Sequence, residues 1–132
     1  MNTTVMMTWE RLLIVGLAGG AGAIARYLLS RFIVVQTGST FPWATLGVNM
    51  LGCFLFGLIW GLAATKGMFS ETTRIMMLVG FLGAFTTFSS FAYETLTLIR
   101  DDQWMACIAN ILAQNVGGIA ALALGAIISR VI

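Results

Sequence analysis

The side chains that could do chemistry lie inside apolar segments of this chain. The stretch Gly80–Glu94, GFLGAFTTFSSFAYE, interleaves phenylalanines with threonine and serine hydroxyls. A helix that faces only lipid needs no such hydroxyls, because a polar group without a partner is costly in hydrocarbon. Hydroxyls and the positive edges of phenylalanine rings are weak, uncharged donors, which suit an anion that has shed its water. We therefore expect this stretch to line an ion pathway.

Glycines in the same stretch predict an irregular backbone. Gly80 and Gly83 precede the pair Thr86-Thr87, so we expect a break in the helix here. Irregular backbone at membrane depth is tolerated only where it is buried in protein or faces a cavity. A break also frees backbone carbonyls, which can coordinate cations. The alternative is that the phenylalanines form an ordinary packing stripe, but the hydroxyls between them count against it.

Further polar residues inside the apolar segments are candidates for the pathway, since such groups are functional by default in a membrane. Arg26 either extends to the lipid headgroups or attracts anions at a pore mouth. Asn49 and Thr45 are four residues apart and share a helical face. Asn49 therefore either makes an interhelical hydrogen bond or directs an N–H into a pore. Glu94 either caps its helix, pairs with an arginine or joins the pathway.

Four apolar runs must position these side chains. The chain is 59% hydrophobic and 9% charged, with a mean hydropathy of +0.95, whereas soluble domains carry about 25% charged residues. We expect transmembrane helices at about 12–35, 43–65, 75–99 and 104–131, each long enough to cross the hydrocarbon. The connections are short, so consecutive helices should be antiparallel neighbours. Residues 1–132 are thus expected to form a single all-α membrane domain.

The composition also excludes several kinds of site. The chain has no histidine, and Cys53 and Cys107 stand alone in apolar runs, so neither a Cys/His metal site nor a disulfide framework is expected. A net charge of +2 is too small to indicate nucleic acid as a partner. Residues 1–9 lack the features of a cleaved signal peptide, so the first run should remain as a helix. No nucleophile–base pair indicates an enzyme.

The distribution of lysine and arginine leaves the orientation open. With a cytoplasmic N-terminus, one side of the membrane would hold four of the seven and the other three. Because this bias sets topology, near balance favours insertion both ways and an antiparallel homodimer. Small residues spaced by four permit close helix packing, either within the chain or between subunits. They recur in Gly16-x-x-x-Gly20, Gly57-x-x-x-Gly61 and Gly117-x-x-x-Ala121-x-x-x-Gly125.

Three motifs together resemble the Fluc/CrcB fluoride channels. They are GGAGAIARY at 19–27, TLGVNMLG at 45–52 and GFLGAFTTFSSFAYE at 80–94. The resemblance covers essentially the whole chain. It implies a dual-topology, antiparallel homodimer in the bacterial plasma (inner) membrane. Such a dimer has two pores and exports fluoride passively, which relieves fluoride toxicity.

The resemblance also implies roles for individual residues. Phe88 and Phe91 match the family's pore phenylalanines, Asn49 its pore-lining asparagine, and Ser90 a hydroxyl of its polar track. The carbonyls of Gly83 and Thr86 match those that hold a central Na⁺ between two subunits. Arg26 and Glu94 match charged positions, and Thr45 joins the pore set through the face it shares with Asn49. We therefore expect the other two phenylalanines of this stretch, Phe81 and Phe85, to serve packing.

The fourth run departs from the family pattern. Gly118 and Leu122 stand where many relatives have hydroxyls, and Gln114 replaces a different polar residue, so the polar track should be thinner here. We interpret Gln114 and Asn115 first as amides that join helices. The competing hypotheses are a small multidrug-type, proton-coupled exporter and a non-catalytic assembly subunit. An exporter of that type needs a carboxylate within its first helix, where this chain has Arg26 instead, with Glu10 just outside.

Overall fold

The computed structural model describes residues 9–132, which fold entirely into helices and their connections. The helices are α1 (Trp9–Thr37), α2 (Trp43–Lys66), α3 (Glu71–Arg74), the π-helical η1 (Ile75–Leu82), α4 (Gly83–Phe85), α5 (Phe88–Arg100), α6 (Trp104–Leu112), the π-helical η2 (Ala113–Gly117) and α7 (Gly118–Val131). They form four spans that are long and apolar enough to cross a membrane. The prediction of an all-helical chain with four such segments is therefore confirmed.

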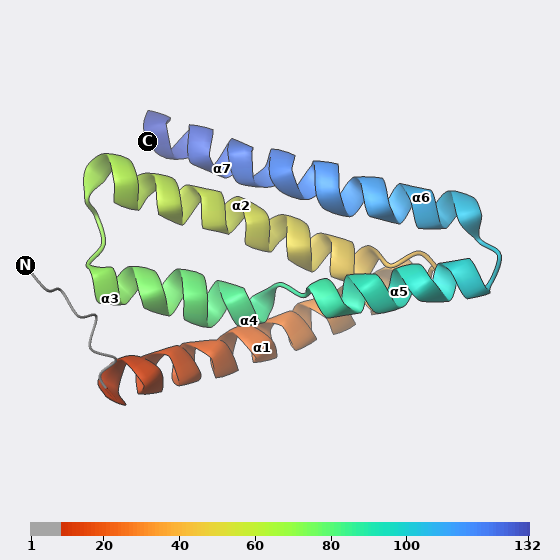
Figure 1. The fold of residues 1–132 in the computed structure, drawn as a ribbon, viewed down its shortest axis with the longest axis horizontal. Helices are drawn as coiled ribbons and strands as arrows, with labels where there is room; N and C mark the ends of the chain where they lie inside the picture. Colours follow the sequence, from red (N-terminus) through yellow and green to blue (C-terminus); the bar gives the residue numbers. More distant parts are fainter. Residues whose placement is uncertain (1–8) are drawn as a thin grey trace, which may run out of the picture.

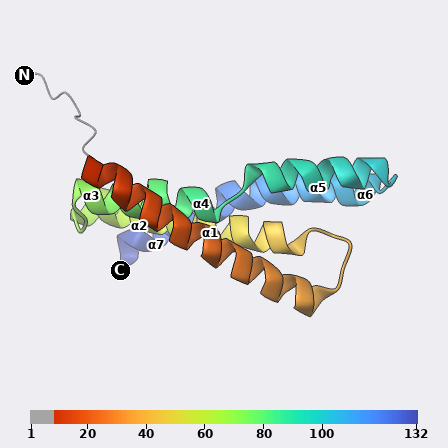
Figure 2. The ribbon, with the colours of Figure 1, turned by 90° about the horizontal axis from the view of Figure 1, so that it is seen from below.

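The spans lie side by side, and successive spans run in opposite directions (Figure 1). The span that contains α2 lies between the α6–α7 span and the span from α3 to α5. Figure 2 shows that α5 and α6 run together as one arm, from which the second half of α1 and the start of α2 diverge. The beginning of α1 and the end of α7 lie at the same end of the molecule.

The third span begins earlier than its apolar run predicts. Gly67 ends α2 with a left-handed backbone at φ 60°, a conformation that glycine adopts without strain. Ser70 then caps α3, because its hydroxyl accepts the Thr73 N–H at 3.1 Å. The helix therefore includes the polar residues Glu71–Arg74, which hydropathy alone assigns to the connection.

Glycines bring α2 and α7 into backbone contact. A Cβ atom on Gly57 would collide with the Leu122 carbonyl oxygen, and one on Gly125 would collide with the Phe54 carbonyl oxygen. In lipid, where no hydrophobic effect holds helices together, such close approach supplies the packing energy. These two small-residue faces therefore serve packing within the chain.

The small residues of α1 divide between two environments. Gly22 packs against the backbone of Phe81 in η1, where a Cβ would collide with its carbonyl oxygen. Gly16 and Gly20 have no other atom within 4 Å of a Cβ, apart from their own helix. One face of α1 therefore packs on the third span, while the face that carries Gly16 and Gly20 is uncovered.

Few apolar side chains are fully buried within one chain. The largest buried cluster consists of Val48, Leu78, Leu82 and Phe85. Phe85 also stacks on Phe81, with ring centroids 5.9 Å apart. Most other large apolar side chains of the described residues are exposed, and an apolar surface of this extent must face lipid or another protein.

The packing of α2 against α7 predicts a sharp difference between two glycine-to-alanine substitutions. Gly125→Ala should destabilise the protein by about 1–3 kcal/mol, because the added methyl group meets backbone that cannot move aside. Gly20→Ala should destabilise the folded chain less, since no atom of the chain outside its own helix lies within 4 Å of its Cβ position. Thermal unfolding in detergent measures both. Equal Tm values for the two variants would contradict this packing.

Candidate functional site

The third span is interrupted by two residues with extended backbone. Thr86 has φ −81° and ψ 156°, and Thr87 has φ −147° and ψ 112°. Before them, α4 ends at Phe85, and after them α5 starts at Phe88. The Thr87 hydroxyl caps the new helix by accepting the Ser90 N–H at 3.2 Å. The interruption thus places α5 as a separate half-helix.

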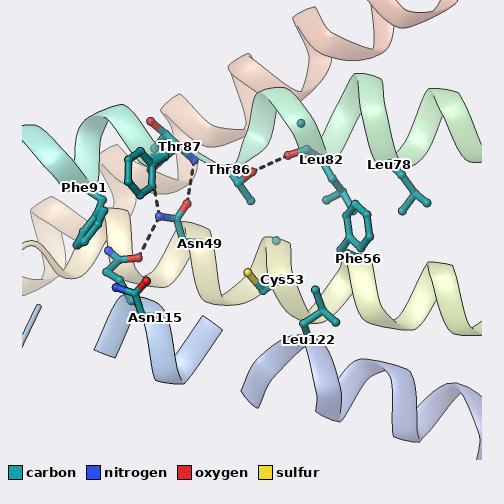
Figure 3. A pocket seen from close by; sticks show the side chains of 14 residues that line it. Asn49, Cys53, Phe56, Leu78, Leu82, Thr86, Thr87, Phe91, Asn115 and Leu122 are labelled. Carbon is teal, nitrogen blue, oxygen red and sulfur yellow. Dashed lines mark hydrogen bonds between the residues drawn. The ribbon is translucent and has the colours of Figure 1, made fainter. Parts of the chain in front are cut away.

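Asn49 on α2 pairs with the backbone of the interruption. Its Oδ1 accepts the Thr87 N–H at 2.9 Å, and its Nδ2 donates to the Thr87 carbonyl at 3.1 Å and to Gln114 Oε1 at 3.0 Å (Figure 3). Extended residues inside a helix leave backbone groups without helical partners, and these must be satisfied in a membrane. One carboxamide therefore satisfies both backbone groups of Thr87.

The bond between Asn49 and Thr87 also leaves the Gly83 carbonyl without its helical hydrogen-bond donor. In an unbroken helix the Thr87 N–H would donate to the Gly83 carbonyl, four residues earlier. Here that N–H donates to Asn49 instead. The Ser90 N–H likewise donates to the Thr87 hydroxyl rather than to the Thr86 carbonyl. Both carbonyls have lost their helical donors, and carbonyl oxygens are the ligands that hard cations prefer.

A cavity of about 330 Å³ lies beside the interruption. It is lined by α2, both sides of the interruption, η2 and the start of α7. In Figure 3, Asn49, Thr87 and Asn115 lie toward one end of this cavity, and Phe56, Leu78 and Leu122 lie toward the other. Five residues that the sequence assigns to the pore or the cation site line it: Asn49, Gly83, Thr86, Phe88 and Phe91.

Phe88 and Phe91 form an edge-on pair at the wall of the cavity. Their ring centroids are 5.4 Å apart and their planes are inclined by 62°. Phe88 is 76% exposed, whereas Phe91 is half-buried. In this arrangement the edge of one ring, which carries the positive part of the quadrupole, faces the other ring, and Phe88 stays largely uncovered within one chain.

A second polar contact lies one helical turn from Asn49. The Thr45 hydroxyl donates to Glu94 Oε1 at 2.6 Å, and the other carboxyl oxygen of Glu94 is buried without a partner in residues 9–132. Glu94 also lines a second cavity of about 370 Å³, which extends to the loop before Trp43. Polar groups therefore continue from the first cavity through Thr45 and Glu94 to the second.

Three residues assigned to the pathway line neither cavity: Arg26, Ser90 and Thr45, the last of which donates to Glu94. Arg26 is half-buried on α1, and neither cavity includes it. The Ser90 hydroxyl accepts from the Thr87 hydroxyl at 3.0 Å and likewise lines neither cavity. Their roles in a pathway thus remain predictions.

The sequence interpretation undervalued Gln114 and Asn115. Both line the first cavity, although neighbouring residues on an α-helix point about 100° apart. They lie in η2, whose wider π-helical turn adds one residue to the repeat. Two adjacent amides in the middle of an apolar run are the signal that could have indicated this position.

The four apolar spans indicate a multi-pass integral membrane protein, with a largely apolar cavity at an interrupted helix that a few amides and hydroxyls line. The profile of a protein family described as CrcB-like protein, Camphor Resistance (CrcB), matches residues 13–126, and the chain belongs to this family. The chain is 43% identical over 124 residues to the "Fluoride-specific ion channel FluC" of Nitrosococcus oceani, covering 94% of this chain and 99% of that protein. It is 45% identical over 123 residues to the protein of the same name from Solidesulfovibrio magneticus, covering 93% and 98%.

The comparison confirms the family indicated by the three sequence motifs. The similar proteins are named as ion channels, which also confirms the expectation that the chain is not an enzyme.

The pairing of Asn49 with Thr87 predicts the effect of an isosteric change. In Asn49→Asp, one oxygen still accepts the Thr87 N–H, but the other faces two acceptors, the Thr87 carbonyl and Gln114 Oε1. We expect a loss of about 1–3 kcal/mol in unfolding free energy, because buried acceptors are left without donors. Thermal unfolding in detergent measures it, with Gln36→Glu on an exposed position as the control. A Tm equal to that of the control would show that Asn49 does not hold the interruption.

Proposed function

We propose that this chain is a fluoride-selective channel that lets F⁻ cross the membrane passively. The observation that carries the proposal is the cavity at the interruption, which is lined by the edge-on pair Phe88 and Phe91 together with amide and hydroxyl side chains. The names of the similar proteins point to the same anion. Within residues 9–132, no lysine or arginine lines this cavity.

Uncharged donors suit both the binding and the release of a small anion. An anion that enters the membrane loses water, and N–H, O–H and ring-edge groups replace part of that shell. Conduction also requires binding weak enough to let the ion leave. Ring edges and amides meet this condition better than a lysine or arginine, because they carry no formal charge.

The remaining polar residues extend the proposed pathway. Thr45 and Glu94 continue the polar groups from Asn49 to the second cavity. The Ser90 hydroxyl, which already bonds to Thr87, adds a polar group next to Phe91. In this proposal Arg26 attracts anions to the mouth of the pathway, where opposite charge raises the local ion concentration.

We propose that two copies assemble as an antiparallel homodimer with two pores. The support is the exposure of Phe88 and of most apolar side chains in one chain, together with the uncovered face at Gly16 and Gly20. A second copy would cover these surfaces and close the pathway, which a single chain leaves open. The near balance of positive charge allows the two orientations that such a dimer requires.

We further propose a structural Na⁺ at the centre of the dimer. The Gly83 and Thr86 carbonyls, which lack their helical donors, would be its ligands, contributed by both copies. Several carbonyl oxygens around one cation are a common way to bind Na⁺ in membrane proteins. The dimer would lie in the bacterial plasma (inner) membrane, where it would let fluoride leave the cell and so relieve fluoride toxicity.

The competing exporter hypothesis lacks its main requirement. The only acidic residue of α1 is Glu10, in its first turn. No carboxylate therefore lies at membrane depth on this helix, as exchange of protons for a cationic drug would need.

Reconstitution in liposomes tests the proposed function directly. Vesicles that contain the protein and are loaded with potassium fluoride should release fluoride when valinomycin balances the charge. The same vesicles loaded with chloride should release almost none, because chloride is larger than fluoride and accepts hydrogen bonds more weakly from the amide and hydroxyl donors of the site. Ion-selective electrodes measure both. Fluoride release equal to that of protein-free vesicles would refute the channel.

The phenylalanine pair provides a second test. Phe88→Ile and Phe91→Ile keep apolar bulk but remove the ring edge, so fluoride release should fall at least about tenfold, the loss of a donor worth roughly 1.4 kcal/mol or more. Phe32→Ile, at an exposed position on α1, is the matched control. Size-exclusion chromatography should show that all three variants elute like the wild-type protein. Unchanged fluoride release from both pore variants would show that Phe88 and Phe91 contribute only to packing.

A further inference from the structure

A third cavity, of about 480 Å³, is lined by α1, α2 and η1. Every residue that lines it is apolar, among them Ala18 on α1, Ile59 on α2, and Met77 and Phe81 on η1. None of the residues assigned to the fluoride pathway lines it. The cavity is partly open, since Met76 at its wall is 39% exposed. In a membrane, an open apolar cavity of this kind must be filled by a lipid tail or by another protein.

Each of the three spans that form this cavity also carries a cation at its end. Each cation is three or seven residues from a lining residue, a spacing that places both on one helical face. The pairs are Arg11 with Ala18, Lys66 with Ile59, and Arg74 with Met77. All three cations belong to the same end of the molecule, where α1 and the third span begin and α2 ends (Figure 1). The apolar cavity therefore has positive charge at the end that meets the membrane surface.

Only one of these three cations is paired with a carboxylate. Arg11 bonds to Glu71 at 3.2 Å, whereas neither Lys66 nor Arg74 forms an ion pair within residues 9–132. Lys66 is exposed and Arg74 is half-buried. The Nε of Arg74 is buried, and its terminal guanidinium nitrogens, which are not, are left to meet an approaching acceptor. Two positive charges beside the cavity are therefore uncompensated by the chain.

From this arrangement we infer that the third cavity and its cations bind an anionic phospholipid. One acyl chain occupies the apolar cavity, and the phosphate accepts hydrogen bonds from the terminal guanidinium nitrogens of Arg74. Lys66 and Arg11 add positive charge around the headgroup. A guanidinium group matches the geometry of phosphate oxygens, and basic residues beside a gap between transmembrane helices favour anionic headgroups. The site lies outside the proposed pathway, so the inference does not rest on fluoride conduction.

Native mass spectrometry tests the role of the charges. The full-length protein in detergent is given equal amounts of phosphatidylglycerol and phosphatidylcholine with identical acyl chains, and it should retain more of the phosphatidylglycerol. Arg74→Gln should retain about fivefold less phosphatidylglycerol, the contribution of one cation near a membrane surface, and as much phosphatidylcholine as before. Arg130→Gln is the matched control, because it removes a cation at the same end from α7, which does not line the cavity. It should retain both lipids like the wild-type protein.

A second pair of variants tests the place of the acyl chain. Met76→Trp puts a larger side chain at the open wall of the cavity, so phosphatidylglycerol retention should fall. Met105→Trp, at a position that is 80% exposed on α6, should retain the lipid like the wild-type protein. Glycerol phosphate carries the charge of the headgroup without acyl chains, so at the same concentration it should not displace the lipid. Circular dichroism should show wild-type helicity in all four variants.

Three results would overturn the inference. The first is equal retention of the two lipids by the wild-type protein; if Met76→Trp then also elutes as a smaller species, the cavity is covered by a second copy of the chain. The second is an equal loss of phosphatidylglycerol in Arg74→Gln and Arg130→Gln, which would mean general attraction to this end of the molecule. The third is displacement of the lipid by glycerol phosphate, which would mean a site for free phosphate.

Discussion

The structure depends on one carboxamide that replaces a helical hydrogen-bond partner. Asn49 accepts the Thr87 N–H at 2.9 Å and donates to the Thr87 carbonyl at 3.1 Å. Without these bonds, extended backbone at membrane depth would leave both groups unsatisfied, at a cost of several kcal/mol. With them, the third span can stop and restart. The cavity, the freed Gly83 carbonyl and the direction of α5 all follow from that interruption.

The interruption is positioned by helix packing and by a small number of polar contacts between helices. Gly57 and Gly125 let α2 and α7 meet backbone to backbone, which fixes the helix that carries Asn49. α5 is joined to α2 by Asn49 and by the Thr45–Glu94 contact. It is joined to α6 by a partly buried hydrogen bond from Asn110 Nδ2 to the Thr95 hydroxyl. Because few apolar side chains are buried in one chain, these polar contacts largely determine how the helices are positioned. The exposed apolar surface is available to lipid or to a second copy.

Hydropathy predicted the four spans, and the glycines and hydroxyls of one apolar run indicated the stretch at the candidate site. Both could be recognised from the sequence because each signal is local. The hydrogen-bond partners of each polar group could not be predicted from local sequence. The sequence left two alternatives for Asn49, an interhelical hydrogen bond or an N–H directed into a pore, and it could not name the partners Thr87 and Gln114, which are distant in sequence. The π-helical turns were also missed, since one added residue hardly changes the apolar pattern of a buried helix. They place Gln114 on the cavity wall, where regular helical spacing gave no reason to expect it.

We propose that the uncharged cavity beside the interruption, where Asn49 bonds to the backbone of Thr87, selects fluoride. Currents across a planar bilayer that contains the purified protein test it most directly, with fluoride on one side and an equal concentration of chloride on the other. We expect a current carried by fluoride, with a reversal potential far toward the fluoride equilibrium value. A reversal potential near zero, which would mean that chloride passes as readily, or the absence of current above that of the bare bilayer, would contradict it.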